Sequence, residues 1–400
     1  MDKDKKTKRK RYSLSENERK KTKNDDINDN DINDNDINEN IIIEMSQSSS
    51  PNILLYSEDD IKEFDEYYYD MKYLNIDLKN IDDLINLGIK YNRGDYCQYT
   101  RYNINLKNLG SLVNPLLKLK NMIGMENVKQ DVFDLLLYQL QDFDNSKDML
   151  HTIIEGEPGV GKTEIAKILG EIYQKMGYCN NDIIKFVKRN DLIGGYLGQT
   201  AIKTQKVLDQ CKGGILIIDE AYSLGNPDKT DIYSKECIDT ITRFLSESPD
   251  TIVFIMGYKE ALNACLFKHN KGLERRFTYR FTIHTYSPKQ LKEILFKIIK
   301  ENNWFIENAD EIPDSFFDDN KDYFKFNGGD MLNLFTKCKF THSIRFFNLN
   351  KKSDNIKNYE DKKKHINFED ITNGFKLLLK DINFSNRKEV IELNHYFMYS

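Results

Sequence analysis

The chain has 400 residues, of which 39% are hydrophobic and 31% are charged, so part of its length can form a substantial folded core. Its formal net charge of −5 excludes a nucleic-acid-binding protein that is basic along its whole length.

The cysteines and the apolar runs narrow the class of protein and its cellular compartment further. The six cysteines are scattered without C-x-x-C or zinc-finger spacing, which favours reduced thiols inside a cell. No apolar run approaches the ~18 residues needed to span a bilayer, and the charged N-terminus lacks a secretory signal. We therefore expect a soluble intracellular protein with no membrane partner. The cytoplasm is favoured, and the nucleus stays open because of a basic N-terminal block.

Residues 1–51 are predicted to be a disordered, charged, low-complexity tail. Single isoleucines among repeated Asn and Asp bury too little surface to offset chain entropy. The basic block from Lys3 to Arg11 fits a solvated tail, a nuclear import signal or a nucleic-acid-binding arm, and these three alternatives stay open. Residues 386–400 are expected to form a C-terminal tail.

Residues 52–110 are predicted to form a small helical extension. The stretch from Asp82 to Gly88 has acids in its first turn and a final glycine, which is typical of a short helix that stops at the glycine. We assign this extension no chemistry. Packing on the core and partner binding are both open roles for it.

Residues 111–286 show strands and helices in alternation. An amphipathic helix containing Val128 and Leu136 comes first. Nearly continuous apolar strands joined by helices then predict a doubly wound parallel sheet covered on both faces. The expected strands are 152–155, 183–188, 215–218, 252–256 and 277–283, and the expected helices are 162–177, 200–211 and 232–247.

Residues 287–385 are predicted to form an all-helical lid domain. Ser287 suits an N-cap and Pro288 the first helical position before an apolar periodic run. Further helices are expected at about 314–323, 329–346 and 368–381.

The stretch from Gly156 to Thr163 reads G-x-x-x-x-G-K-T between an apolar strand and a periodic helix, which is the setting of a P-loop. Glycines let backbone N–H groups curl around phosphate oxygens, and the helix dipole favours the same anion. Lys162 is predicted to reach the β- and γ-phosphates, and Thr163 to place its hydroxyl on Mg²⁺. The predicted phosphate-binding residues are Gly156, Glu157, Pro158, Gly159, Val160, Gly161, Lys162, Thr163 and Glu164.

Two acids, Asp219 and Glu220, follow the apolar run from Ile215 to Ile218. They are expected at the carboxyl end of a buried strand, which is the edge where ligands bind in open α/β sheets. Asp219 is predicted to hold Mg²⁺ through its water shell, and Glu220 to orient and deprotonate the attacking water. The P-loop with this acid pair indicates a nucleoside triphosphatase that uses Mg²⁺.

Several ordered motifs together resemble the AAA+ ATPases, and within them the CbbX and stage V sporulation protein K-like subgroup. The resemblance covers about Leu112 to Leu379. Besides the P-loop and the acid pair, it rests on four stretches: Asp191 to Thr204, Gly214 to Leu224, Met256 to Lys259 and Asn270 to Phe277.

The resemblance implies roles for further residues. Ile123 and Gly124 match positions that pack the adenine. Tyr196 matches the pore-loop aromatic that grips a protein client. Arg276 matches the arginine finger that reaches a neighbouring subunit's γ-phosphate, with Arg275 beside it as the second candidate. Active assemblies are then expected to be homo-oligomeric rings, hexamers by the family pattern.

The sequence departs from the family pattern at two positions. Tyr258 lies near the first sensor position, where the family commonly has Asn. Gly329 stands where the lid normally carries an arginine, and Lys337 is an alternative cation. As a whole, the resemblance implies a ring-forming ATPase that uses ATP and Mg²⁺ and remodels a protein partner. The alternatives are an ATP-binding scaffold with little turnover, which the missing lid arginine favours, and a nucleic-acid-acting ATPase, which the basic block favours.

Overall fold

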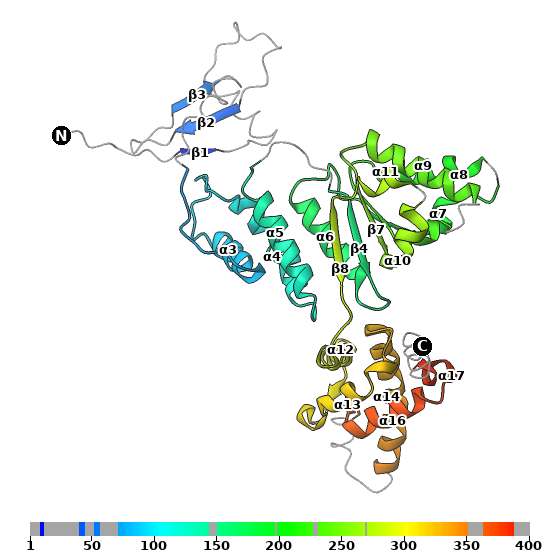
Figure 1. Ribbon diagram of the computed structural model, residues 1–400. Helices are drawn as coiled ribbons and strands as arrows, with labels where there is room; N and C mark the ends of the chain where they lie inside the picture. The colour runs from blue at the N-terminus through cyan, green and yellow to red at the C-terminus, as the bar shows by residue number, and fades with distance from the viewer. Residues whose placement is uncertain are drawn as a thin grey trace, which may run out of the picture. The chain divides into compact units, whose positions relative to one another are not determined.

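The computed structural model describes residues 71–143, 150–196, 198–226, 231–268, 270–350 and 363–387, together with the backbone of three short strands nearer the N-terminus. The chain divides into two units: residues 1–74 with 97–103, and residues 75–96 with 104–400. Figure 1 shows the elements of both units.

In the first unit, strands β1 (Arg9–Arg11), β2 (Asn40–Glu44) and β3 (Asn52–Tyr56) pair antiparallel in the order β1-β2-β3. The disordered tail predicted over residues 1–51 lies otherwise outside the described residues. So do the start of the Lys3–Arg11 block and the C-terminal tail beyond residue 387.

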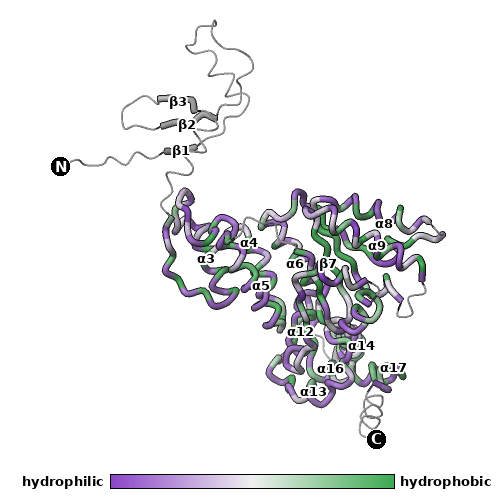
Figure 2. The backbone as a smooth tube through the Cα atoms, turned by 45° about the horizontal axis from the view of Figure 1, so that its top comes forward, coloured by the Kyte–Doolittle hydropathy of each residue, from purple (hydrophilic) through white to green (hydrophobic). Residues whose placement is uncertain are grey.

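The second unit contains a parallel sheet of five strands in the order β5-β6-β7-β4-β8, which confirms the predicted doubly wound α/β fold. The strands are β4 (Thr152–Gly156), β5 (Ile184–Val187), β6 (Ile215–Ile218), β7 (Ile252–Gly257) and β8 (Tyr279–Ile283). The residues of β6 and most of β7 are apolar, because helices cover both faces of the sheet. Figure 2 shows hydrophobic residues concentrated along these strands around β7.

Helix α6 (Lys162–Lys175) packs on one face of the sheet, where the Tyr173 ring meets Phe254 of β7 edge-on at 5.5 Å. The other face forms a continuous core with helices α8 (Gln199–Asp209) and α9 (Ile232–Glu247), in which Ile153, Leu216 and Ile255 are buried. The short elements α7 (Arg189–Leu192), η1 (Ala221–Leu224), α10 (Lys259–Ala261), η2 (Leu262–Phe267) and α11 (Lys271–Glu274) connect the strands.

Within residues 71–143, the helices before the sheet are α3 (Ile81–Arg93), α4 (Leu106–Lys120) and α5 (Glu126–Gln139). The predicted helix stop at Gly88 is wrong, because α3 continues to Arg93 and ends at Gly94, which has a φ of 88°. Gly88 instead allows α3 to approach α4, since a Cβ there would lie 2.7 Å from Cγ2 of Val113. The expected domain boundary between residues 110 and 111 falls inside α4, whose apolar face packs on both α3 and α6.

The lid domain is helical, as predicted. Helix α12 (Pro288–Glu301) begins with Ser287 as N-cap and Pro288 as first residue. The remaining elements are β9 (Phe305–Ile306), η3 (Ala309–Glu311), α13 (Asp314–Asp319), η4 (Lys321–Tyr323), α14 (Gly328–Asn350), β10 (His365–Ile366), α16 (Phe368–Leu378) and α17 (Ile382–Ser385). The predicted helix at 314–323 is broken at Asn320, and the predicted helix at 368–381 is broken after Leu378. In the described residues, no helix combines the length and apolar character that a membrane crossing requires.

Candidate nucleotide site

The P-loop lies between β4 and α6, as the sequence predicts. Gly159 and Gly161 have φ angles of 72° and 95°, in the left-handed region that disfavours a side chain. Val160 between them is fully buried and anchors the loop. Gly161 caps α6 without a side-chain hydrogen bond, so the first N–H groups of the helix have no side-chain acceptor. Backbone donors of this kind, at the start of a helix, suit an anionic group such as a phosphate.

Lys162 lies at the start of α6 with its ammonium folded against the loop. Its Nζ donates to the carbonyl oxygens of Gly156 and Glu157, both at 2.8 Å. Burial lowers the pKa of Lys162, and the charges of Asp219, Glu157 and Glu220 oppose that shift. The structure thus brings the lysine and the acid pair into one electrostatic neighbourhood.

Asp219 and Glu220 follow β6 at the same sheet edge as the P-loop, with β7 between them and β4. Oδ1 of Asp219 accepts from the Glu220 N–H at 3.0 Å, and Oδ2 lies 3.5 Å from Nζ of Lys188. Glu220 has a φ of 53°, a backbone conformation that residues other than glycine adopt at an energetic cost. Its side chain is exposed, so it is accessible to a water molecule.

The residues proposed for Mg²⁺ fit that ion chemically. The Thr163 hydroxyl is exposed at the first turn of α6, and the Asp219 carboxylate is half-buried at the adjoining sheet edge. Both groups are hard oxygen donors, and Mg²⁺ typically takes one or two protein oxygens, with water and phosphate oxygens completing its octahedron. Among the described residues, no cluster of three or more His, Cys, Asp or Glu side chains forms an all-protein metal cage.

Tyr258 and Tyr222 form an aromatic pair beside the lysine. Their ring centroids are 5.2 Å apart with 25° between the planes, and Nζ of Lys162 lies 4.9 Å from the centroid of the Tyr258 ring. Burial is the largest of the effects that raise the pKa of Tyr222 to about 12. The sequence predicts Tyr258 near a sensor position. It gives Tyr222 no role of its own, since Tyr222 appears only within the motif from Gly214 to Leu224.

Ile123 and Gly124 lie in the turn between α4 and α5. Gly124 has a φ of 66°, and a Cβ there would lie 2.8 Å from Nε2 of Gln290. The flanking Met122 and Met125 place their Cε atoms 3.4 and 3.0 Å from the position that a Gly161 Cβ would take. The turn therefore adjoins the P-loop, and the two methionines are neighbours that the sequence analysis missed.

Arg276 lies at the end of the sheet opposite the P-loop. Its guanidinium donates to the Ser246 hydroxyl from Nη2 at 2.6 Å and to the Gly272 carbonyl from Nη1 at 2.7 Å. β8 begins three residues later and pairs with β4 so that Tyr279 faces Thr152 and Ile283 faces Gly156. The amino and carboxyl ends of this strand pair are about 13 Å apart at 3.3 Å per residue, and Arg276 precedes the amino end. Arg275 is exposed.

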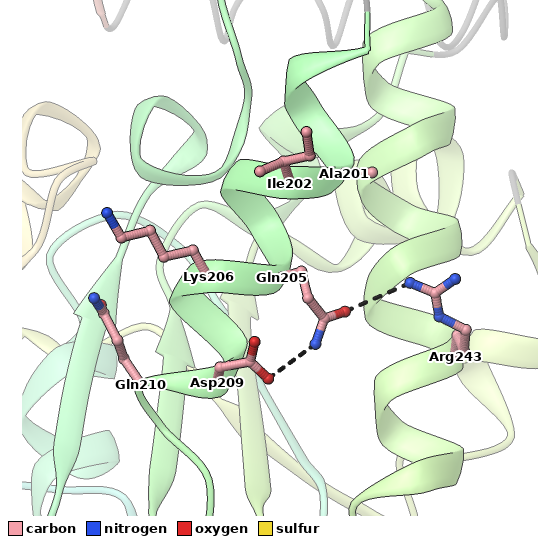
Figure 3. Close-up of a pocket in the computed structure, with 7 residues that line it drawn as sticks. All are labelled: Ala201, Ile202, Gln205, Lys206, Asp209, Gln210 and Arg243. Atoms are coloured by element: carbon pink, nitrogen blue, oxygen red, sulfur yellow. Dashed lines mark hydrogen bonds between the residues drawn. The ribbon is translucent and has the colours of Figure 1, made fainter.

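Tyr196 is 73% exposed in the loop before α8, where the Gly194 N–H donates to the Thr200 hydroxyl at 3.1 Å. A separate open hollow of about 660 Å³ lies on α8 and α9. Figure 3 shows its lining, in which Gln205 bonds to Asp209 and Arg243. None of the proposed phosphate-binding residues lines this hollow, so it is distinct from the P-loop.

On the lid, Gly329 is the second residue of α14, and Lys337 lies nine residues after Gly328. At 1.5 Å per residue, Lys337 is about 13 Å along the helix from its start, and its Nζ lies over the Phe340 ring at 5.8 Å. The structure therefore does not place this lysine at the start of α14. The sequence analysis also missed Tyr286 and Asn327, which contact the P-loop from this side.

Comparisons with known proteins show what this chain is similar to. Residues 152–285 match the family described as ATPase family associated with various cellular activities. A putative CfxQ-like protein of Acanthamoeba polyphaga mimivirus is 41% identical over 68% of this chain and 68% of its own length. Stage V sporulation protein K of Bacillus subtilis (strain 168) is 31% identical over 48% of this chain and 61% of its own length. Among solved structures, the FIGL-1 AAA domain in complex with ADP has a TM-score of 0.45 and 14% identity, covering 69% of this chain and 89% of that one.

The match to the viral CfxQ-like protein spans 279 residues, far more than the stretch from the P-loop to the acid pair. Gly156 and Asp219 lie at the same edge of the sheet, which is the edge where ligands bind in open α/β sheets. The chain belongs to the AAA family of ATPases, within the branch of the CfxQ-like proteins and stage V sporulation protein K.

Proposed function

We propose that the chain is one subunit of a Mg²⁺-dependent ATPase ring, a hexamer by the family pattern, that remodels a protein partner. In this proposal Lys162 and the N–H groups of the P-loop bind the phosphates. Thr163 and Asp219 hold Mg²⁺, which neutralises charge on the phosphates when bound. Glu220 takes the proton of the attacking water.

The observation that carries the ring is the position of Arg276. It precedes the amino end of β8, whereas the P-loop follows the carboxyl end of the adjacent strand β4. Its guanidinium is already held at that end by Ser246 and Gly272. Its own P-loop is therefore out of reach, which supports the proposal that this cation serves a site on another subunit. Such an arginine is worth about 10³–10⁵ in rate.

The first test separates binding from hydrolysis. Glu220→Gln keeps ATP binding and loses turnover, because the amide cannot accept the proton of the water. Lys162→Ala loses binding, because the phosphates lose their cation. Both are measured by nucleotide titration and steady-state phosphate release. Turnover at the wild-type rate in the Glu220→Gln variant would contradict the role of this base.

The second test asks whether two subunits share a site. Subunits with Arg276→Ala mixed with subunits carrying Lys162→Ala regain part of the activity, because some interfaces then combine an intact P-loop with an intact arginine. Arg275→Ala is the matched control, since it removes an exposed arginine one position away. Absence of recovery at every mixing ratio would count against a shared site. Loss of activity in the Arg275→Ala subunits alone would move the role to Arg275.

The proposed contact with a protein partner is Tyr196. An aromatic side chain that is 73% exposed in a loop with Gly195 and Gly198 is suited to grip a polypeptide. Partner proteins retained by the Glu220→Gln variant in the presence of ATP are expected to be lost from a Glu220→Gln/Tyr196→Ala double variant, while ATP binding is unchanged. Equal retention by both variants would exclude this contact.

An ATP-binding scaffold with little turnover is the second candidate, and the observation that favours it is Gly329 in place of the lid arginine. A scaffold would bind ATP and assemble without sustained phosphate release. Steady-state release at a constant rate over many turnovers would exclude the scaffold.

A further inference from the structure

The backbone carbonyls of P-loop residues 156–160 all accept hydrogen bonds. Those of Gly156 and Glu157 accept from Lys162. The next three carbonyls accept bonds from beyond the sheet. Pro158 O accepts from Nδ2 of Asn327 at 3.1 Å, Gly159 O from the N–H of Gly328 at 3.1 Å, and Val160 O from the hydroxyl of Tyr286 at 2.8 Å. Because a carbonyl and the following N–H point in opposite directions, these bonds favour N–H groups that face inward.

Asn327 is the centre of this contact. It is only 3% exposed and has a φ of 48°, a conformation that Asn tolerates better than most residues. Its amide bridges two segments: Nδ2 donates to Pro158 O, while Oδ1 accepts from the backbone N–H of Tyr286 at 3.2 Å. Its own carbonyl accepts from Asp330 and Met331 in the first turn of α14. One residue thus joins the P-loop and the β8–α12 connection through its side chain and the first turn of α14 through its backbone carbonyl.

Gly159 has no side chain, and this lets the backbone of the lid approach the P-loop closely. A Cβ on Gly159 would lie 2.0 Å from the carbonyl oxygen of Phe326 and 3.0 Å from the N atom of Gly329. Gly159 therefore serves the lid contact as well as the phosphate cradle. On the lid side, Gly328 donates its backbone N–H to the loop, and Gly329 has no side chain that could reach a phosphate.

The lid turn that carries Asn327 is itself fixed. Asp330 is fully buried, and its Oδ2 accepts from the Phe326 N–H at 2.7 Å and pairs with Nη1 of Arg387 at 2.8 Å. The guanidinium of Arg387 also lies over the Phe326 ring at 4.4 Å. A turn braced on both sides transmits a displacement of the P-loop to α14, since it has little freedom to absorb it.

We propose that Asn327 is a positioning residue that couples nucleotide occupancy of the P-loop to the position of the lid helix α14. Nucleotide occupancy changes the loop, the loop carbonyls move Asn327 and Gly328, and α14 follows. This inference rests on the proposed role of the P-loop in binding phosphates. The coupling needs no lid arginine, which is consistent with Gly329 at that position.

The experiment compares three variants of the full chain. Asn327→Asp keeps the size and the acceptor for Tyr286 but replaces the donor to Pro158 O with a carboxylate oxygen. Tyr286→Phe removes only the hydroxyl donor to Val160 O. Asn348→Asp, at the exposed far end of α14, is the matched control for the added charge. Each is measured for ADP affinity, for KM and kcat of phosphate release, and for amide hydrogen exchange of residues 324–332 with and without ADP.

Loss of one buried hydrogen bond corresponds to about tenfold weaker ADP binding, and we expect at least that for Asn327→Asp and about threefold to tenfold for Tyr286→Phe. KM rises more than kcat falls, because a misplaced loop weakens binding first. In the wild type, ADP changes the exchange of residues 324–332. In the Asn327→Asp variant this response is lost, and in the Asn348→Asp variant it is retained.

Wild-type ADP affinity and an unchanged exchange response in Asn327→Asp would overturn the proposal, as would an equal loss in Asn348→Asp. If Asn327→Asp fails to fold, Tyr286→Phe decides, and wild-type behaviour of that variant overturns the proposal. Absence of ADP binding by the unmodified chain would instead overturn the nucleotide site itself, and this inference with it. ADP binding without any exchange response in the wild type would overturn the coupling alone.

Discussion

The Tyr258 ring, rather than its hydroxyl, is predicted to support Lys162. The ring lies beneath the ammonium, with 4.9 Å from Nζ to the centroid, and stacks on Tyr222 at 5.2 Å. Gly257 permits this packing, because a Cβ there would lie 2.9 Å from Cδ1 of Tyr222. Tyr258→Phe keeps both ring contacts and removes only the hydroxyl, whereas Tyr258→Leu removes both contacts.

The geometry sets the size of the effect. A cation over an aromatic ring is worth about 0.5–1 kcal/mol when exposed and about 2 kcal/mol when desolvated. Lys162 is half-buried and its pKa is lowered by burial, so we take about 1–2 kcal/mol for this contact. The stacked pair adds about 0.5–1.5 kcal/mol. Their sum, about 1.5–3.5 kcal/mol, predicts a loss of about 10- to 300-fold in kcat/KM for Tyr258→Leu.

Phosphate release measured over a range of ATP concentrations tests this reasoning. Tyr258→Phe is expected to stay within about threefold of the wild type, because a Phe ring also attracts a cation. If Tyr258→Phe loses as much activity as Tyr258→Leu, the hydroxyl is the acting group and the argument from the ring is refuted. A Phe variant whose kcat falls while its KM is unchanged would indicate that the hydroxyl orients the attacking water.

Three further predictions concern stability and the loop. Arg345→Ala is expected to cost about 3–5 kcal/mol of unfolding free energy in denaturant titration, because it leaves the buried Asp370 carboxylate without its ion-pair partner. Burial alone would raise the pKa of Asp370, but hydrogen bonds from Arg345 and His342 hold it below its usual value, so its contribution is complete above about pH 4 and is lost at lower pH. Burial, followed by the charge of Arg276, lowers the pKa of His151 to about 4. Stability should therefore fall by about 3 kcal/mol between pH 6.5 and 4, a slope that His151→Asn should remove in thermal unfolding. Gly159→Ala should abolish nucleotide binding, because its Cβ would overlap the lid backbone, whereas Gly195→Ala, whose Cβ meets nothing within 4 Å, should bind as the wild type does.

Where the determinants are local, the sequence predicts the structure closely. β6 and α9 occupy the expected residues, since a bounded apolar run and an amphipathic period define them. The start of α12 follows from Ser287 and Pro288, whose capping acts within four residues. The position of the P-loop and Asp219 at one edge of the sheet follows from the rule that parallel strands place their carboxyl ends together.

The missed residues are those whose role depends on distant contacts. Asn327 meets Pro158 across 169 positions, and Tyr286 meets Val160 across 126. Neither separation leaves a local pattern in the sequence. At Gly88 the local pattern misleads. A glycine that locally indicates a helix stop lies inside α3, where it allows close packing on α4. Sequence reasoning therefore identified the chemical groups at the sheet edge and missed the groups that hold their backbone in place.

The strand β8 connects the two proposed halves of the ATP site within one subunit. Arg276 precedes it, and Tyr286, which donates to the P-loop carbonyl of Val160, follows it. Between them, five residues of β8 are paired in register with β4, from Tyr279 opposite Thr152 to Ile283 opposite Gly156. Paired strands of a buried parallel sheet move as one body, because sliding them would break every hydrogen bond of the ladder. The arginine that we propose for a neighbouring subunit's site is therefore mechanically linked to the subunit's own P-loop, without any contact between the two sites.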